Sequence, residues 1–358
     1  MIRRAIAGSL AAGVSVLTFR FVAARGRDRI LAAPRTAPGE DRLGPALDAL
    51  GGEVVRIRSR DGLRLAGRWL PAEVAAFGAT PWAPGPWRVD PHEAVLLLHG
   101  WTGSCAPDLV ELGPSLRRTA GVLGLDFGGH GGSDDAPTTF GLREVEDVAG
   151  ALTWLGERGI ERVALVGRSM GGITAIASVA VLGDGSLAGV DADPAAAAHV
   201  APPRRPRIVA IVADSVPPEL RVPIAARLRG PARRQVAGAI LGSAARTLGA
   251  DPRETEPIRV IGLLEGVPLL LISGEADTTV PLADARRLAA AAPAGTVHWI
   301  VPGADHGQAH EVDPAGYETR LTDHLRAALI VARGSSPIIA ARMPISGGVD
   351  DRASSLED

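Results

Sequence analysis

Short apolar runs recur along the central and C-terminal parts of the chain, and each run ends in glycine, aspartate or serine. An uninterrupted apolar run of this length, bounded by turn residues, is typical of a strand that is buried on both faces of a sheet. The sequence therefore predicts six such strands, within residues 93–100, 120–128, 161–169, 207–215, 267–275 and 296–304.

Helical periodicity separates several of these runs. Residues 140–159, 170–183 and 282–293 carry apolar side chains at the three- and four-residue spacing of an amphipathic or buried helix. Strands that alternate with helices form a mostly parallel sheet with helices on both faces. The predicted fold class is therefore α/β.

The stretch before these runs has a different period. Residues 51–71 alternate between apolar and polar side chains around Asp61-Gly62, a turn dipeptide, which predicts an antiparallel hairpin at one sheet edge. Residues 71–92 and 183–206 are rich in Pro, Ala and Gly and predict surface loops. The helical, arginine-rich segment at about 216–258 predicts a cap insertion over the active site.

Residues 1–30 predict a hydrophobic anchor or a signal segment. Arg3 and Arg4 precede an apolar run from Ala5 to Phe19, and Arg20 interrupts the run near its end. More arginines follow the run than precede it, which favours a membrane anchor with the catalytic domain on the cytoplasmic side; export is the alternative. A third interpretation is an ordinary helix packed on the domain.

Length and composition fit one catalytic domain. The 358 residues divide into the N-terminal segment, a linker at 31–52, a domain at 53–333 and a tail at 334–358 for which we expect disorder. The net charge of −2 gives no support to a nucleic-acid partner. Cys105 is the one cysteine, and the His and acidic residues show no metal-ligand spacing, so we expect neither metal nor cofactor.

Chemically capable side chains follow three of the predicted strands. Ser169 lies in Gly-Arg-Ser-Met-Gly, Asp277 in Gly-Glu-Ala-Asp, and His306 in Gly-Ala-Asp-His-Gly. Ligands of open parallel sheets bind beyond the carboxyl ends of the strands, so these residues are placed where a site is expected. Asp214, at the end of the run 207–215, occupies a comparable position and is the alternative acid.

Five motifs in order resemble those of the α/β-hydrolase family over residues 53–330. HGWTG resembles the oxyanion loop, DFGGHGGSD a family loop, GRSMGG the nucleophile elbow, GEADTTVP the acid loop and GADHG the histidine loop. The resemblance, to the serine esterase, lysophospholipase and serine-peptidase-like branch, implies an α/β-hydrolase fold with a helical cap.

The resemblance and the chemistry together assign roles. A serine hydroxyl needs a base to take its proton as it attacks, and a carboxylate orients the base, so Ser169, His306 and Asp277 form the expected triad. The resemblance implies that the backbone N–H groups of Trp101 and Met170 form the oxyanion hole.

The predicted function is hydrolysis of a carboxylic ester, or a related acyl bond, through an acyl-enzyme on Ser169. The expected substrate is a small-molecule or lipid acyl compound. An acyltransferase or a thioesterase would use the same triad, and a catalytically silent binding protein of the same fold is the alternative outside the enzymes.

Overall fold

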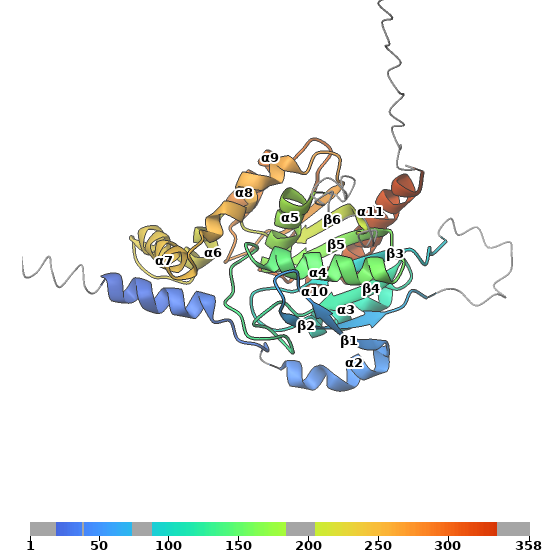
Figure 1. Ribbon diagram of the computed structural model, residues 1–358. Helices are drawn as coiled ribbons and strands as arrows, with labels where there is room; N and C mark the ends of the chain where they lie inside the picture. Colours follow the sequence, from blue (N-terminus) through green and yellow to red (C-terminus); the bar gives the residue numbers. More distant parts are fainter. Residues whose placement is uncertain (1–18, 38, 74–87, 184–204, 335–358) are drawn as a thin grey trace, which may run out of the picture.

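The computed structural model describes residues 19–37, 39–73, 88–183 and 205–334 (Figure 1). Residues 1–18 of the predicted N-terminal segment lie outside the described residues, as do most of the two predicted surface loops and residues 335–358 of the predicted tail. None of the helices within the described ranges is long and apolar enough to cross a membrane.

Eight strands of the described chain form one sheet in the order β1-β2-β4-β3-β5-β6-β7-β8. β1 and β2 form the predicted antiparallel hairpin at one edge, β2 pairs antiparallel with β4, and the remaining pairs are parallel. The strands are β1 (Glu53–Arg58), β2 (Arg64–Leu70), β3 (Glu93–Leu98), β4 (Gly121–Leu125), β5 (Arg162–Arg168), β6 (Arg207–Asp214), β7 (Leu269–Gly274) and β8 (Val297–Val301).

Helices cover both faces of the sheet, as the alternation of patterns predicts (Figure 1). Leu96 and Leu98 of β3 contribute to the apolar cluster that includes α4 (Glu144–Glu157), α5 (Met170–Leu182) and α9 (Leu282–Ala291). Val95 and Leu97 contribute to the other cluster, with α3 (Ala106–Leu116) and α11 (Pro314–Gly334). Successive side chains of a strand point to opposite faces, so the apolar runs of β3 to β7 supply both clusters, whereas β8, at the sheet edge, is mostly half-buried and not buried on both faces as predicted.

The predicted cap is helical. It contains α6 (Arg221–Ala226) and α7 (Arg233–Leu248), followed by the short elements η2 (Pro252–Thr255), α8 (Pro257–Val260) and η3 (Ile261–Leu263). The short helix α10 (Ala309–Val312) directly precedes α11 in the chain.

The region before the hairpin has more structure than its periodicity predicts. Residues 19–31 form a helix beside α7, and Ala23, Ile30 and Leu31 of this helix are buried (Figure 1). The segment expected to be a linker contains η1 (Glu40–Leu43) and α2 (Gly44–Leu50). Leu47 and Leu50 of α2 pack against the cluster that contains α3, which gives this segment a reason to be ordered.

Candidate active site

Ser169 occupies the sharp turn between β5 and α5. Its backbone has φ 51° and ψ −110°, a conformation that L-residues adopt at a cost of order 1–3 kcal/mol. The turn requires glycine on both sides: a Cβ at Gly167 would overlap the backbone of Gly171, and one at Gly171 would overlap the carbonyl oxygen of Leu98. The sequence thus places the Ser169 side chain at the carboxyl end of the sheet on a tight, strained turn.

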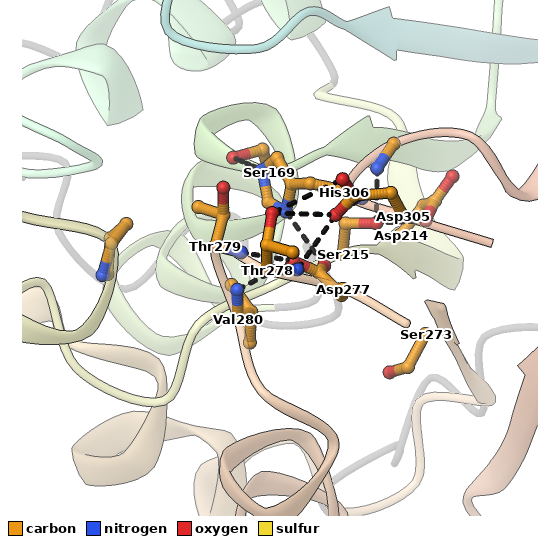
Figure 2. Close-up of polar contacts among 12 residues, drawn as sticks. Ser169, Asp214, Ser215, Ser273, Asp277, Thr278, Thr279, Val280, Asp305 and His306 are labelled. Atoms are coloured by element: carbon orange, nitrogen blue, oxygen red, sulfur yellow. Dashed lines mark hydrogen bonds and ion pairs between the residues drawn. The ribbon is translucent and has the colours of Figure 1, made fainter. Parts of the chain in front are cut away.

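His306 connects Ser169 to Asp277 (Figure 2). Its Nε2 lies 3.0 Å from Ser169 Oγ, and its Nδ1 lies 2.9 Å from Asp277 Oδ2. Both distances are within hydrogen-bond range. Three residues that are far apart in the sequence therefore form one continuous chain of polar contacts.

The second oxygen of Asp277 is held by its own loop. Asp277 Oδ1 accepts backbone N–H bonds from Thr279 at 2.8 Å and Val280 at 2.7 Å. These bonds fix the carboxylate and leave Oδ2 to His306. The Asp277 side chain is only 2% exposed, so little water competes for it.

Asp305, the residue before His306, connects the loop of Asp277 to the loop of His306. Its Oδ1 accepts the backbone N–H groups of Thr278 and His306, each at 2.7 Å. The hydrogen bond from Thr278, followed by the one from His306, lowers the pKa of the Asp305 carboxyl. Asp305 thus joins the acid loop to the histidine loop without touching the imidazole.

Asp214 faces a different set of partners. Its Oδ1 accepts a 2.8 Å hydrogen bond from the Ser215 hydroxyl, and its Oδ2 accepts one of 3.2 Å from the Tyr317 hydroxyl. Arg168 Nε lies 3.7 Å from Oδ2. Burial raises the pKa of the Asp214 carboxyl, and the Arg168 charge opposes that rise. The structure therefore brings Asp277, and not Asp214, into contact with the imidazole.

The loop after β3 lies next to the serine. A Cβ built on Gly100 would be 3.9 Å from Ser169 Cβ, which places the backbone that leads into Trp101 beside the turn. His130 Nε2 lies 2.7 Å from the carbonyl oxygen of Trp101 and braces this loop. Met170 is the first residue of α5, where a backbone N–H has no acceptor within its own helix.

His99 is buried behind the same loop. Its Nε2 accepts the backbone N–H of Phe127 at 3.1 Å, so its Nδ1 is the nitrogen that donates to the carbonyl oxygen of Gly100 at 2.7 Å. Burial, followed by the charge of His130, lowers the pKa of His99 to about 4. His99 is therefore neutral near pH 7 and fixed in one tautomer, which suits a structural role.

Sequence reasoning did not anticipate the contacts of two residues close to the site. The Ser215 hydroxyl, besides donating to Asp214, accepts the backbone N–H of Gly307 at 2.9 Å and so holds the histidine loop. Arg168, between Gly167 and Ser169, forms ion pairs with Glu111 at 2.7 Å and Asp108 at 3.1 Å. The two acids lie on α3, about 60 residues earlier in the chain, and no local pattern connects them to Arg168.

Asp108, an ion-pair partner of Arg168, has a pKa close to neutral. Burial raises its pKa to about 6, although the nearby Arg168 charge lowers it. Within the described ranges, no group of three or more His, Cys, Asp or Glu side chains is arranged to hold a metal ion.

Comparisons with known proteins identify the family and the fold. A family profile described as "Alpha/beta hydrolase family" matches residues 95–319. No curated protein matches the chain. Among solved structures, an esterase of Pyrococcus furiosus is similar with a TM-score of 0.55 and 22% identity, over 84% of this chain and 98% of the other.

Two further structures show the same fold at lower identity. The alpha/beta hydrolase GrgF of a Penicillium species has a TM-score of 0.53 and 19% identity, over 78% of this chain and 99% of the other. A membrane phospholipase A, described as a bacterial virulence factor, has a TM-score of 0.51 and 16% identity, over 92% and 99%.

Proposed function

The chain belongs to the alpha/beta hydrolase family, and from this premise we propose that it hydrolyses carboxylic esters through an acyl-enzyme on Ser169. The observation that carries the proposal is the continuous contact from Ser169 Oγ through His306 to Asp277. This is the arrangement that converts an unreactive hydroxyl into a nucleophile.

The first step is attack on the acyl carbon. His306 Nε2 takes the proton of Ser169 Oγ as the new C–O bond forms, and Asp277 stabilises the resulting imidazolium through Nδ1. The imidazolium then gives that proton to the departing alcohol. In the second half, His306 takes a proton from water, the water oxygen attacks the acyl carbon, and Ser169 recovers its proton as the acid is released.

Negative charge on the carbonyl oxygen must be stabilised during both steps. We assign this to the backbone N–H groups of Met170 and Trp101, since Met170 opens α5 and the Trp101 loop lies beside Ser169. The N-terminus of α5 adds a favourable dipole. One such donor is worth about 3–4 kcal/mol in the transition state.

The test is hydrolysis of p-nitrophenyl esters with acyl chains from acetyl to palmitoyl by the full-length protein. We expect turnover, with a burst of nitrophenol that matches the enzyme concentration where deacylation is slow. Ser169→Ala should abolish both burst and turnover. Binding of esters without turnover by folded wild-type protein would contradict the proposal and favour a silent binding protein, whereas turnover retained in Ser169→Ala would place the reaction elsewhere.

We also propose that the N-terminal segment brings the enzyme to a membrane surface and to lipid acyl substrates. Phe19 and Phe21 are 44% and 64% exposed, and the Arg25 guanidinium lies 5.8 Å from the centre of the Phe21 ring. Exposed aromatic and basic side chains together suit an anionic lipid interface. The arginines that follow the apolar run favour a cytoplasmic position for the domain.

Flotation of the full-length protein with vesicles tests this association. We expect binding that increases with phosphatidylserine content and falls in the double variant Phe19→Ser and Phe21→Ser. Val297→Ser with Ile330→Ser is the control, because these side chains are 52% and 54% exposed and lie outside the N-terminal segment. Equal binding by both double variants would argue against the role of the two phenylalanines.

A further inference from the structure

The segment that connects the N-terminal helix to the domain runs along the loop beside Ser169. We propose that residues 30–37 and 39–40, the N-terminal arm, are a positioning element of the acyl site and hold the loop of residues 101–104 in its active conformation. This inference rests on the proposed function, because the loop contains Trp101, the assigned oxyanion donor.

The arm contacts this loop through three hydrogen bonds. The indole Nε1–H of Trp101 donates to the carbonyl oxygen of Ile30 at 3.2 Å, and the backbone N–H of Gly103 donates to that of Pro34 at 3.2 Å. The backbone N–H of Ser104 donates to the Glu40 carboxylate at 2.8 Å. Trp101, Gly103 and Ser104 are therefore each bonded to the arm.

Gly103 shows how closely the two segments approach. Its φ of 102° favours glycine, and a Cβ at this position would overlap the Glu40 carboxylate and lie 3.2 Å from Ala37 Cβ. The loop conformation and the arm thus fit each other, and a side chain at residue 103 would separate them.

The arm is itself fixed to the domain at its other contacts. The backbone N–H groups of Thr138 and Gly131 donate to the carbonyl oxygens of Leu31 at 2.9 Å and Arg35 at 2.7 Å. Leu31 is buried in the same apolar cluster as Met170. The arm is thus anchored independently of the loop, which is what a support requires.

The loop is consequently held from two sides. His130 contacts the Trp101 carbonyl oxygen at 2.7 Å, and the arm contacts the Trp101 indole and the next residues. An oxyanion hole acts through donors that are already in place when charge develops. Loosening the arm should therefore reduce kcat more than it raises KM.

Glu40 offers the sharpest test, because its carboxylate accepts a hydrogen bond from the loop backbone. Glu40→Ala removes the acceptor for Ser104, whereas Glu40→Gln keeps an oxygen there. Asp41→Ala is the matched control: it deletes the neighbouring carboxylate of the same one-turn helix, and Asp41 is exposed. All variants are made in the full-length chain.

We expect Glu40→Ala to lower kcat for p-nitrophenyl acetate about tenfold with KM changed less than threefold, Glu40→Gln to recover most of the rate, and Asp41→Ala to match wild type. Thermal unfolding of each variant separates a local change from loss of the fold. If Glu40→Ala keeps wild-type kcat, or if Asp41→Ala is equally impaired, the arm has no positioning role. Wild-type protein without esterase activity would overturn the proposed function and the inference together.

Discussion

Two aspartates at the carboxyl edge of the sheet illustrate how position and role differ. Asp214 ends β6 and Asp277 follows β7, and both are almost fully buried. Asp277 contacts the imidazole of His306, whereas Asp214 contacts the hydroxyls of Ser215 and Tyr317 and lies near Arg168. The end of a strand brings a carboxylate to the site, but its partners decide what it does there.

The partners also explain how two carboxylates are accommodated in a region with little access to water. Asp277 receives two backbone N–H groups from its own loop, and these stabilise its charge in place of water. Asp214 has the Arg168 guanidinium and two hydroxyl donors instead. The surroundings of Asp277 leave one oxygen free to contact His306, whereas Asp214 holds the Ser215 hydroxyl that supports the histidine loop.

The largest contrast is expected between Asp277→Asn and Asp214→Asn. Asp277→Asn should lower kcat by roughly 10³–10⁴ with little change in KM, because the imidazole loses its tautomer and its counter-charge. Asp214→Asn should lower kcat no more than about tenfold. Steady-state kinetics on one ester measures both, and a larger loss in Asp214→Asn would reverse the assignment of the acid.

A smaller effect is expected at Ser215, which transmits the support of Asp214 to the histidine loop. Ser215→Ala leaves the half-buried backbone N–H of Gly307 without its 2.9 Å acceptor, a loss of about 1 kcal/mol. We expect kcat to fall several-fold and the pH dependence of kcat to be displaced or broadened, because the loop that positions the His306 imidazole has lost a hydrogen bond.

Ser273→Ala is the matched control for that measurement. Ser273 lies in the neighbouring strand β7, and its hydroxyl contacts His298, away from the triad (Figure 2). Its removal should leave kcat and the pH profile at wild-type values. Equal effects of the two serine variants would indicate a general response of the sheet edge.

The last comparison concerns stability, not rate, at Asp108 in the Arg168 cluster. Its pKa is about 6 in the folded protein, above the ordinary value of 3.8, so the folded state binds the proton more tightly. Its contribution is therefore fully present at low pH and is lost as the pH rises through about 6. The wild type should lose roughly 2 kcal/mol relative to Asp108→Asn between pH 4 and pH 7.

Urea unfolding of the two proteins at pH 4, 5, 6 and 7 measures this difference. Comparison with the variant is needed because His99, with its pKa lowered to about 4, contributes a slope of opposite sign over part of the same range. A constant difference between the two proteins would show that Asp108 does not titrate in this range.

Much of the fold follows from local patterns. The buried apolar runs and the alternating hairpin have periods that distinguish strand from helix, and the glycines around Ser169 mark the tight turn. Ser169, Asp277 and His306 follow the carboxyl ends of three parallel strands, β5, β7 and β8, and this places them at one edge of the sheet.

The remaining features depend on contacts between distant segments. No period in residues 31–52 indicates that Glu40 meets Ser104, and nothing near Arg168 in the sequence indicates its pairing with Asp108. The structure of residues 31–37 and 39–52 comes from tertiary packing and backbone hydrogen bonds, which a pattern along the sequence does not record. The choice between Asp214 and Asp277 likewise depended on loop geometry.

The most direct test of the central claim is phosphonylation of the full-length protein with a fluorophosphonate probe, followed by mass spectrometry of the labelled peptide. The triad predicts one adduct, on Ser169, formed at a rate that falls at least a hundredfold in His306→Ala and Asp277→Asn and much less in Asp214→Asn. An adduct on another residue, or labelling that is indifferent to His306, would contradict the account.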